Sequence, residues 1–88
     1  RRGDGGVDIR CWFKGRLILI QCKNWTNNIG PETIRSLRGV TCTEKRGTIG
    51  IVIGINFTTG AIREAEKSKI RPILLTTKDR YDVKITKL

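Results

Sequence analysis

The spacing of apolar and polar residues along the 88-residue chain predicts alternating strands and helices. Alternation with a period of two and short runs of Ile, Val and Leu are typical of strands, whereas apolar residues three or four positions apart are typical of helices. The predicted strands cover residues 7–13, 16–23, 48–55 and 70–75, with a further short strand over 81–88. One predicted helix begins at Pro31 and ends near Thr43, and a second follows a cap at residues 58–60.

The alternation also assigns side chains to faces. One face of the first strand carries Val7, Ile9, Cys11 and Phe13, and the other carries Asp8, Arg10 and Trp12. The second strand is apolar on both faces, which is expected of a central strand that is covered on two sides. The inward stripe of the first helix is predicted to consist of Ile34, Leu37 and either Thr41 or Val40.

A turn at residues 14–15 predicts that the first two strands form an antiparallel hairpin. Counting outward from this turn brings Asp8 opposite the end of the second strand, where Gln21 and Lys23 lie. Gln21 and Lys23 are two residues apart and project together, while Cys22 points the other way. A carboxylate, an amide and an ammonium therefore converge, as a metal-dependent phosphodiesterase requires.

The element order ββαβαβ favours an α/β fold in which helices flank a mixed sheet and the crossovers are right-handed. At this length the chain forms at most one domain, residues 1–88, with a limited core. The hydrophobic fraction of 38% is enough for a modest globular fold and argues against wholesale disorder.

Charge and composition narrow the function classes. Eighteen Lys and Arg against eight Asp and Glu give a net charge of +10, which indicates a polyanionic partner. Absence of His from the sequence argues against histidine catalysis, and the wide spacing of the three Cys argues against a structural zinc site. The cysteines suit a reducing, intracellular compartment. No apolar stretch approaches the roughly 18 residues of a membrane span, so no membrane role is expected.

Several segments together resemble the Mrr-like branch of the PD-(D/E)xK restriction-endonuclease superfamily. They are GDGGVDI at residues 3–9, QCK at 21–23 with the following Asn24-Trp25, IGPE at 29–32, GIVI at 50–53 and FTTGA at 57–61. The resemblance covers nearly the whole chain and implies a restriction-endonuclease-like core. It also implies that this segment lacks the first helix and first strand of that core, which are expected upstream of Arg1.

The resemblance further implies a Mg²⁺-dependent endonuclease of the type IV (Mrr-like) class that hydrolyses DNA, with Mn²⁺ as a substitute cation. Asp8, Gln21 and Lys23 would form the catalytic set. Asp8, the amide oxygen of Gln21 and the backbone carbonyl of Cys22 would hold the cation, because Mg²⁺ prefers hard oxygen ligands. Lys23 would hold the attacking water or steady the phosphate as a fixed positive charge.

For DNA binding, the candidate residues are Arg10, Trp25, Arg35 and Arg38. Trp25 could stack on a base or seal the edge of the core, of which core packing is the more frequent case, and charged residues on helices are often only solvated. A homodimer and an additional domain or upstream segment are further expectations from the resemblance.

Two alternatives stay open at the level of sequence. Many relatives carry Glu where this chain has Gln21, so a catalytically inactive relative that only binds nucleic acid is one alternative. A basic RNA-associated protein without a metal site is the other. Asp4 is a competing carboxylate, which we interpret as a turn residue because it lies in the glycine-rich segment.

Overall fold

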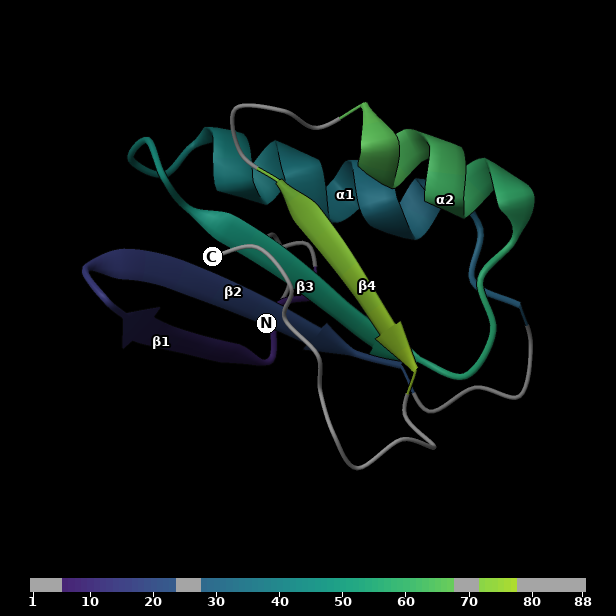
Figure 1. Cartoon of the computed structure of the whole chain (residues 1–88), viewed down its shortest axis with the longest axis horizontal. Helices are drawn as coiled ribbons and strands as arrows, with labels where there is room; N and C mark the ends of the chain where they lie inside the picture. The colour runs from purple at the N-terminus through teal and green to yellow at the C-terminus, as the bar shows by residue number, and fades with distance from the viewer. Residues whose placement is uncertain (1–5, 24–27, 68–71, 78–88) are drawn as a thin grey trace.

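The computed structural model describes residues 6–23, 28–67 and 72–77. Its elements are β1 (Ile9–Phe13), β2 (Arg16–Cys22), α1 (Pro31–Cys42), β3 (Ile49–Gly54), α2 (Thr59–Glu66) and β4 (Ile73–Thr77). The order ββαβαβ and the mixed sheet confirm the predicted fold class (Figure 1). The short strand predicted over residues 81–88 lies outside the described residues.

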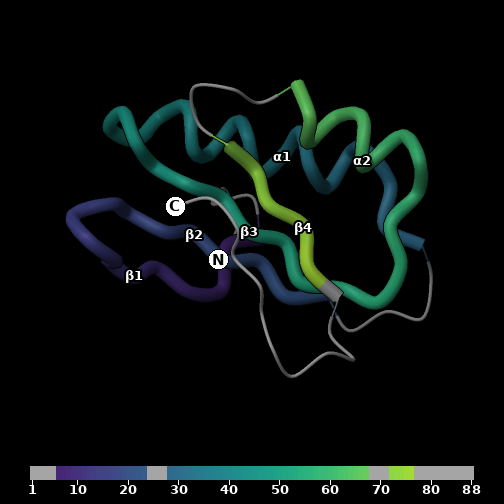
Figure 2. The backbone as a smooth tube through the Cα atoms, viewed as in Figure 1, coloured from purple at the N-terminus to yellow at the C-terminus, as the bar shows by residue number. Residues whose placement is uncertain are grey.

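The sheet has the strand order β1-β2-β3-β4. β1 is antiparallel to β2, whereas β2, β3 and β4 are parallel to one another. α1 and α2 lie side by side on the same face of the sheet (Figures 1 and 2). Two successive crossovers of the same hand that progress in the same direction across a sheet place both helices on one face.

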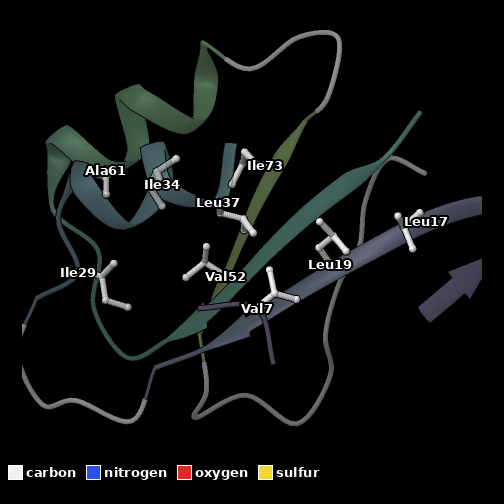
Figure 3. Packing of buried hydrophobic residues seen from close by; sticks show 9 residues of the cluster. All are labelled: Val7, Leu17, Leu19, Ile29, Ile34, Leu37, Val52, Ala61 and Ile73. Atoms are coloured by element: carbon white, nitrogen blue, oxygen red, sulfur yellow. The ribbon is translucent and has the colours of Figure 1, made fainter. Parts of the chain in front are cut away.

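The core fills the space between this sheet face and the helices (Figure 3). Its buried members are Val7, Leu17, Leu19, Ile29, Ile34, Leu37, Val52, Ala61 and Ile73. A second cluster on the opposite sheet face contains Ile18, Ile49 and Ile51. The prediction that the second strand is apolar on both faces is therefore confirmed.

Close packing of α1 on the sheet depends on a glycine in β3. A Cβ atom at Gly50 would lie 2.9 Å from Cδ2 of Leu37 and 2.6 Å from Cδ1 of Ile73, which is closer than such atoms approach each other. The helix can therefore approach the β3 backbone only because this side chain is missing. Ile34, Leu37 and Thr41 are the buried residues of α1, as the sequence predicted.

The β1–β2 hairpin closes through two residues with positive φ. Lys14 has φ 51° and Gly15 has φ 78°, the backbone combination of the two-residue turns that match strand twist. The turn fixes the register, in which Ile9 pairs with Ile20 and Trp12 pairs with Leu17. The predicted hairpin is confirmed.

The first strand begins later than predicted, at Ile9 rather than Val7. Val7 is buried in the helix-side cluster, whereas Ile9 pairs with Ile20, which packs on the opposite face. The prediction that Val7 and Ile9 share a face is therefore wrong. The backbone N–H of Asp8 donates to the Ile20 carbonyl at 2.8 Å, one residue out of the ladder register, so the alternation breaks at this point.

Glu64 connects the two helices. This side chain is only 8% exposed, and its carboxylate accepts a hydrogen bond from Arg38 of α1, which also donates to the Glu64 backbone carbonyl at 3.0 Å. Arg35 and Lys67 lie 3.5 and 3.8 Å from the other carboxylate oxygen. The hydrogen bond from Arg38 lowers the pKa of Glu64 below its ordinary value; burial acts in the opposite direction, and the positive charges of Lys67, Arg38 and Arg35 add to the lowering.

We expect acid to weaken this connection. Because the folded-state pKa of Glu64 is depressed, its contribution to stability is present above the ordinary glutamate pKa of about 4.3 and is lost as the pH falls through the lower folded-state value. Glu64→Gln should therefore lower the urea midpoint at neutral pH and lose less stability than the unsubstituted protein on acidification. The matched control is Glu66→Gln, at an exposed position of α2. Equal acid sensitivity in Glu64→Gln and Glu66→Gln would contradict the conclusion that the lowered pKa of Glu64 contributes to stability.

Candidate active site

The carboxyl end of β2 presents two polar side chains on one side of the sheet. Gln21 and Lys23 both line a cavity of about 280 Å³, which confirms the prediction that they project together. The other wall residues are Gly6, from the segment before β1, and Glu32, Thr33 and Ser36, from the first turns of α1. Strand β2 thus contributes one wall of the cavity and helix α1 contributes another.

Gln21 is the buried member of this group, with 4% of its surface exposed. Its Oε1 atom is buried and has no hydrogen-bond partner among the described residues. The opposite end of the amide faces Gly6, where a Cβ atom would lie 2.3 Å from Nε2. A buried amide oxygen without a partner costs about 1 to 3 kcal/mol. An acceptor of this kind is therefore expected to be satisfied by water or by a bound ligand.

Asp8 is held against the end of β2 by its own side chain. Its Oδ2 atom accepts a hydrogen bond of 2.8 Å from the backbone N–H of Cys22. Asp8 is exposed and is not one of the cavity wall residues, but its carboxylate is bonded to the residue between Gln21 and Lys23. Asp8 therefore approaches the end of β2 as the hairpin predicted, while a common site with the Gln21 and Lys23 side chains stays a prediction.

The backbone carbonyl of Cys22 points to the same side of β2 as Asp8. The next backbone N–H, that of Lys23, donates to Ile53 of β3 at 2.8 Å. In a trans peptide the C=O and N–H groups point in opposite directions, and the described residues contain no cis peptide. The Cys22 carbonyl is therefore directed away from β3, toward the edge where the Asp8 carboxylate lies.

The first turn of α1 is positioned by the segment that precedes it. Ile29 is buried, its N–H donates to Asn56 at 2.9 Å, and its carbonyl accepts from Thr58 at 3.0 Å. These bonds tie the chain before α1 to the chain after β3, so the helix begins beside the carboxyl ends of β2 and β3. Pro31 then occupies the start of the helix, where its missing N–H has no cost.

The oxygen donors at this site suit a hard divalent cation. Asp8 supplies a carboxylate, Cys22 a carbonyl, and Gln21 a buried amide oxygen that has no other partner among the described residues. Mg²⁺ usually takes one or two carboxylates and completes its octahedron with water and substrate. Within the described residues, no group of three or more His, Cys, Asp or Glu could hold a metal.

Comparison with known families agrees with this geometry. The sequence profile of the Mrr catalytic family, described as a restriction endonuclease, matches residues 1–81. The chain belongs to this restriction endonuclease family. No curated protein and no solved structure matches the chain. Within the described ranges, no helix is both long and apolar enough to cross a membrane.

The candidate DNA-binding residues of this restriction endonuclease domain are held by carboxylates. Arg10 donates to Glu44 at 3.1 Å, and Arg35 and Arg38 both contact Glu64. Trp25 and the competing carboxylate Asp4 lie outside the described residues. Arg10 and Arg35 stay more than half exposed in these ion pairs, and a role of the three arginines in DNA binding stays a prediction.

Four wall residues were not predicted from the sequence as site residues: Gly6, Glu32, Thr33 and Ser36. None of Glu32, Thr33 and Ser36 is among the candidate site residues that the sequence predicts. The available signal was their spacing, because Glu32 and Ser36 are four residues apart and lie on the same face of a helix. Which face of α1 would meet the end of β2 depended on the crossover and could not be read from that spacing.

Gly6 is expected to be required for the position of Gln21. Gly6 and Gly15 have nearly the same φ, +79° and +78°, but a Cβ at Gly15 would meet nothing within 4 Å. Gly15→Ala should therefore report the backbone cost alone, about 1 to 2 kcal/mol. Gly6→Ala should lose that amount plus about 1 to 3 kcal/mol for displacing Gln21. Equal unfolding free energies in urea for the two variants would show that the Gly6–Gln21 contact has no energetic role.

Proposed function

We propose that this restriction endonuclease domain is a Mg²⁺-dependent endonuclease that hydrolyses DNA phosphodiester bonds, of the type IV, Mrr-like class. The observation that carries the proposal is the Asp8 carboxylate bonded to Cys22, between Gln21 and Lys23 of the cavity wall. Family membership supplies the nuclease activity, and the net charge of +10 favours a polyanionic substrate.

Each residue has a proposed role. Asp8, the Gln21 amide oxygen and the Cys22 carbonyl would hold Mg²⁺, or Mn²⁺ as its substitute. A cation bound there supplies Lewis acidity and lowers the pKa of a bound water. Lys23 holds the attacking water or the phosphate by donating hydrogen bonds. Gly6 and Asp8 fix the positions of these groups through their contacts with Gln21 and Cys22.

Lys23→Ala should remove Mg²⁺-dependent cleavage while leaving DNA affinity close to its original value. The loss of a fixed cation at the reacting phosphate is expected to lower the rate by about 10²- to 10³-fold. Lys45→Ala is the matched control, because Lys45 is exposed beyond the opposite end of α1 and its removal changes the net charge equally. Nicking of supercoiled plasmid measures the rate, and fluorescence anisotropy of a labelled duplex measures the affinity.

An inactive relative that only binds nucleic acid is the competing function, and one observation favours it: the described site supplies a neutral amide at Gln21 in place of a charged carboxylate. Binding of duplex DNA without nicking in either Mg²⁺ or Mn²⁺ would establish that function. Binding of RNA alone, with no response to either cation, would instead establish an RNA-associated protein.

The arginine pair on α1 allows a separate test of DNA binding. Arg35 is 57% exposed and Arg38 is 27% exposed. Arg35→Ala should weaken DNA binding, reduce the slope of log affinity against log salt by about one, and leave the urea midpoint nearly unchanged. Arg38→Ala should lower the midpoint clearly, because Glu64 loses its main hydrogen-bond donor. Identical salt slopes for Arg35→Ala and the unsubstituted protein would exclude Arg35 from the DNA interface.

A further inference from the structure

The cavity beside β2 contains a carboxylate with no role in the proposed mechanism. Glu32 lies in the first turn of α1 and lines the cavity together with Gln21 and Lys23. Its side chain folds back over Gly30, where a Cβ atom would lie 2.6 Å from Oε1. Glycine at residue 30 thus leaves the space that the Glu32 carboxylate occupies.

Interaction with the helix dipole explains why an acidic residue lies in the first turn of a helix. It does not explain why Glu32 shares a cavity wall with the buried amide of Gln21. The same cavity wall contains Gln21, which is 4% exposed and whose Oε1 has no partner among the described residues. An anion is a poor candidate for this cavity, although Lys23 and a helix N-terminus would attract one, because the Glu32 carboxylate opposes it. A cation is attracted both by Glu32 and by the unpaired Gln21 oxygen.

The charges around the cavity also favour a cation as the ligand. Asp8 contributes one negative charge at the end of β2 and Lys23 contributes one positive charge, so these two sum to zero. Gln21 adds an oxygen but no charge. A further negative charge nearby would strengthen the binding of a divalent cation at this position, and among the six wall residues Glu32 is the acidic one.

We propose that Glu32 is the second carboxylate of a divalent-cation site and acts together with the Gln21 amide oxygen. The inference rests on the proposed function and assigns α1 a part in it. Glu32 compensates for the neutral amide of Gln21, and the cation is a hard one such as Mg²⁺ or Mn²⁺. The hydroxyl groups of Thr33 and Ser36 in the same wall can accept hydrogen bonds from water that completes the coordination.

The test is calorimetric titration of the purified protein with Mn²⁺ alone, without DNA. Glu32→Gln should weaken Mn²⁺ binding by about tenfold or more, whereas Glu66→Gln on exposed α2 should bind as the unsubstituted protein does. Gln21→Glu should strengthen binding, and Gln21→Glu combined with Glu32→Gln should return the affinity close to the original. Thermal melts of each variant without metal identify any loss of folding.

The outcomes separate this inference from the proposed function. Unchanged Mn²⁺ affinity in folded Glu32→Gln overturns the role of Glu32, while Asp8→Asn and plasmid nicking still test the nuclease independently. A carboxylate with a purely structural role would lower the stability of Glu32→Gln, and Gln21→Glu would not then restore the Mn²⁺ affinity. That result also overturns the role of Glu32 in metal binding. Failure of the unsubstituted protein to bind Mn²⁺ overturns the inference together with metal dependence.

Discussion

The hydrogen bond between the Asp8 carboxylate and the Cys22 backbone N–H is the constraint on which the site depends. It occupies the place where the next ladder bond of the hairpin would form, and it replaces a backbone acceptor with a side-chain carboxylate. The β1 segment consequently leaves the ladder before Ile9, Val7 turns into the helix-side core, and Gly6 reaches the Gln21 amide. A regular hairpin extended by two residues would give none of these contacts.

This local break has a cost that the surrounding structure offsets. Glycine adopts the positive φ of residue 6 without steric cost, but the irregular ladder lowers the stability of the strand start. Burial of Val7 among Leu17, Leu19 and the other core residues stabilises the fold by about 1.5 to 3 kcal/mol. The core thereby anchors one side of the site, while Ile29 and its two backbone bonds anchor the helix on the other side.

Much of this arrangement could be predicted from the sequence because it follows from the number of residues on each side of the hairpin turn. A two-residue turn fixes the register of a hairpin, so the approach of Asp8 to Gln21 and Lys23 follows from chain positions alone. The early break of β1 could not be predicted, because alternation assumes a regular ladder and contains no information on the Gly6–Gln21 contact. The wall formed by Glu32 depends on tertiary packing, in which Leu37 contacts the bare backbone at Gly50.

The ion pairs between α1 and α2 show how part of the net positive charge is arranged on the helices. Arg35, Arg38 and Lys67 surround the single carboxylate of Glu64, so three positive charges and one negative charge leave a local excess of two. Arg35 and Lys67 stay 57% and 70% exposed in this cluster. The carboxylate therefore orders these cations without neutralising them, which reduces the side-chain entropy that binding a phosphate would otherwise cost. A buried acid at the joint of two helices thus connects them, and the exposed cations around it would be available to the polyanion proposed as partner.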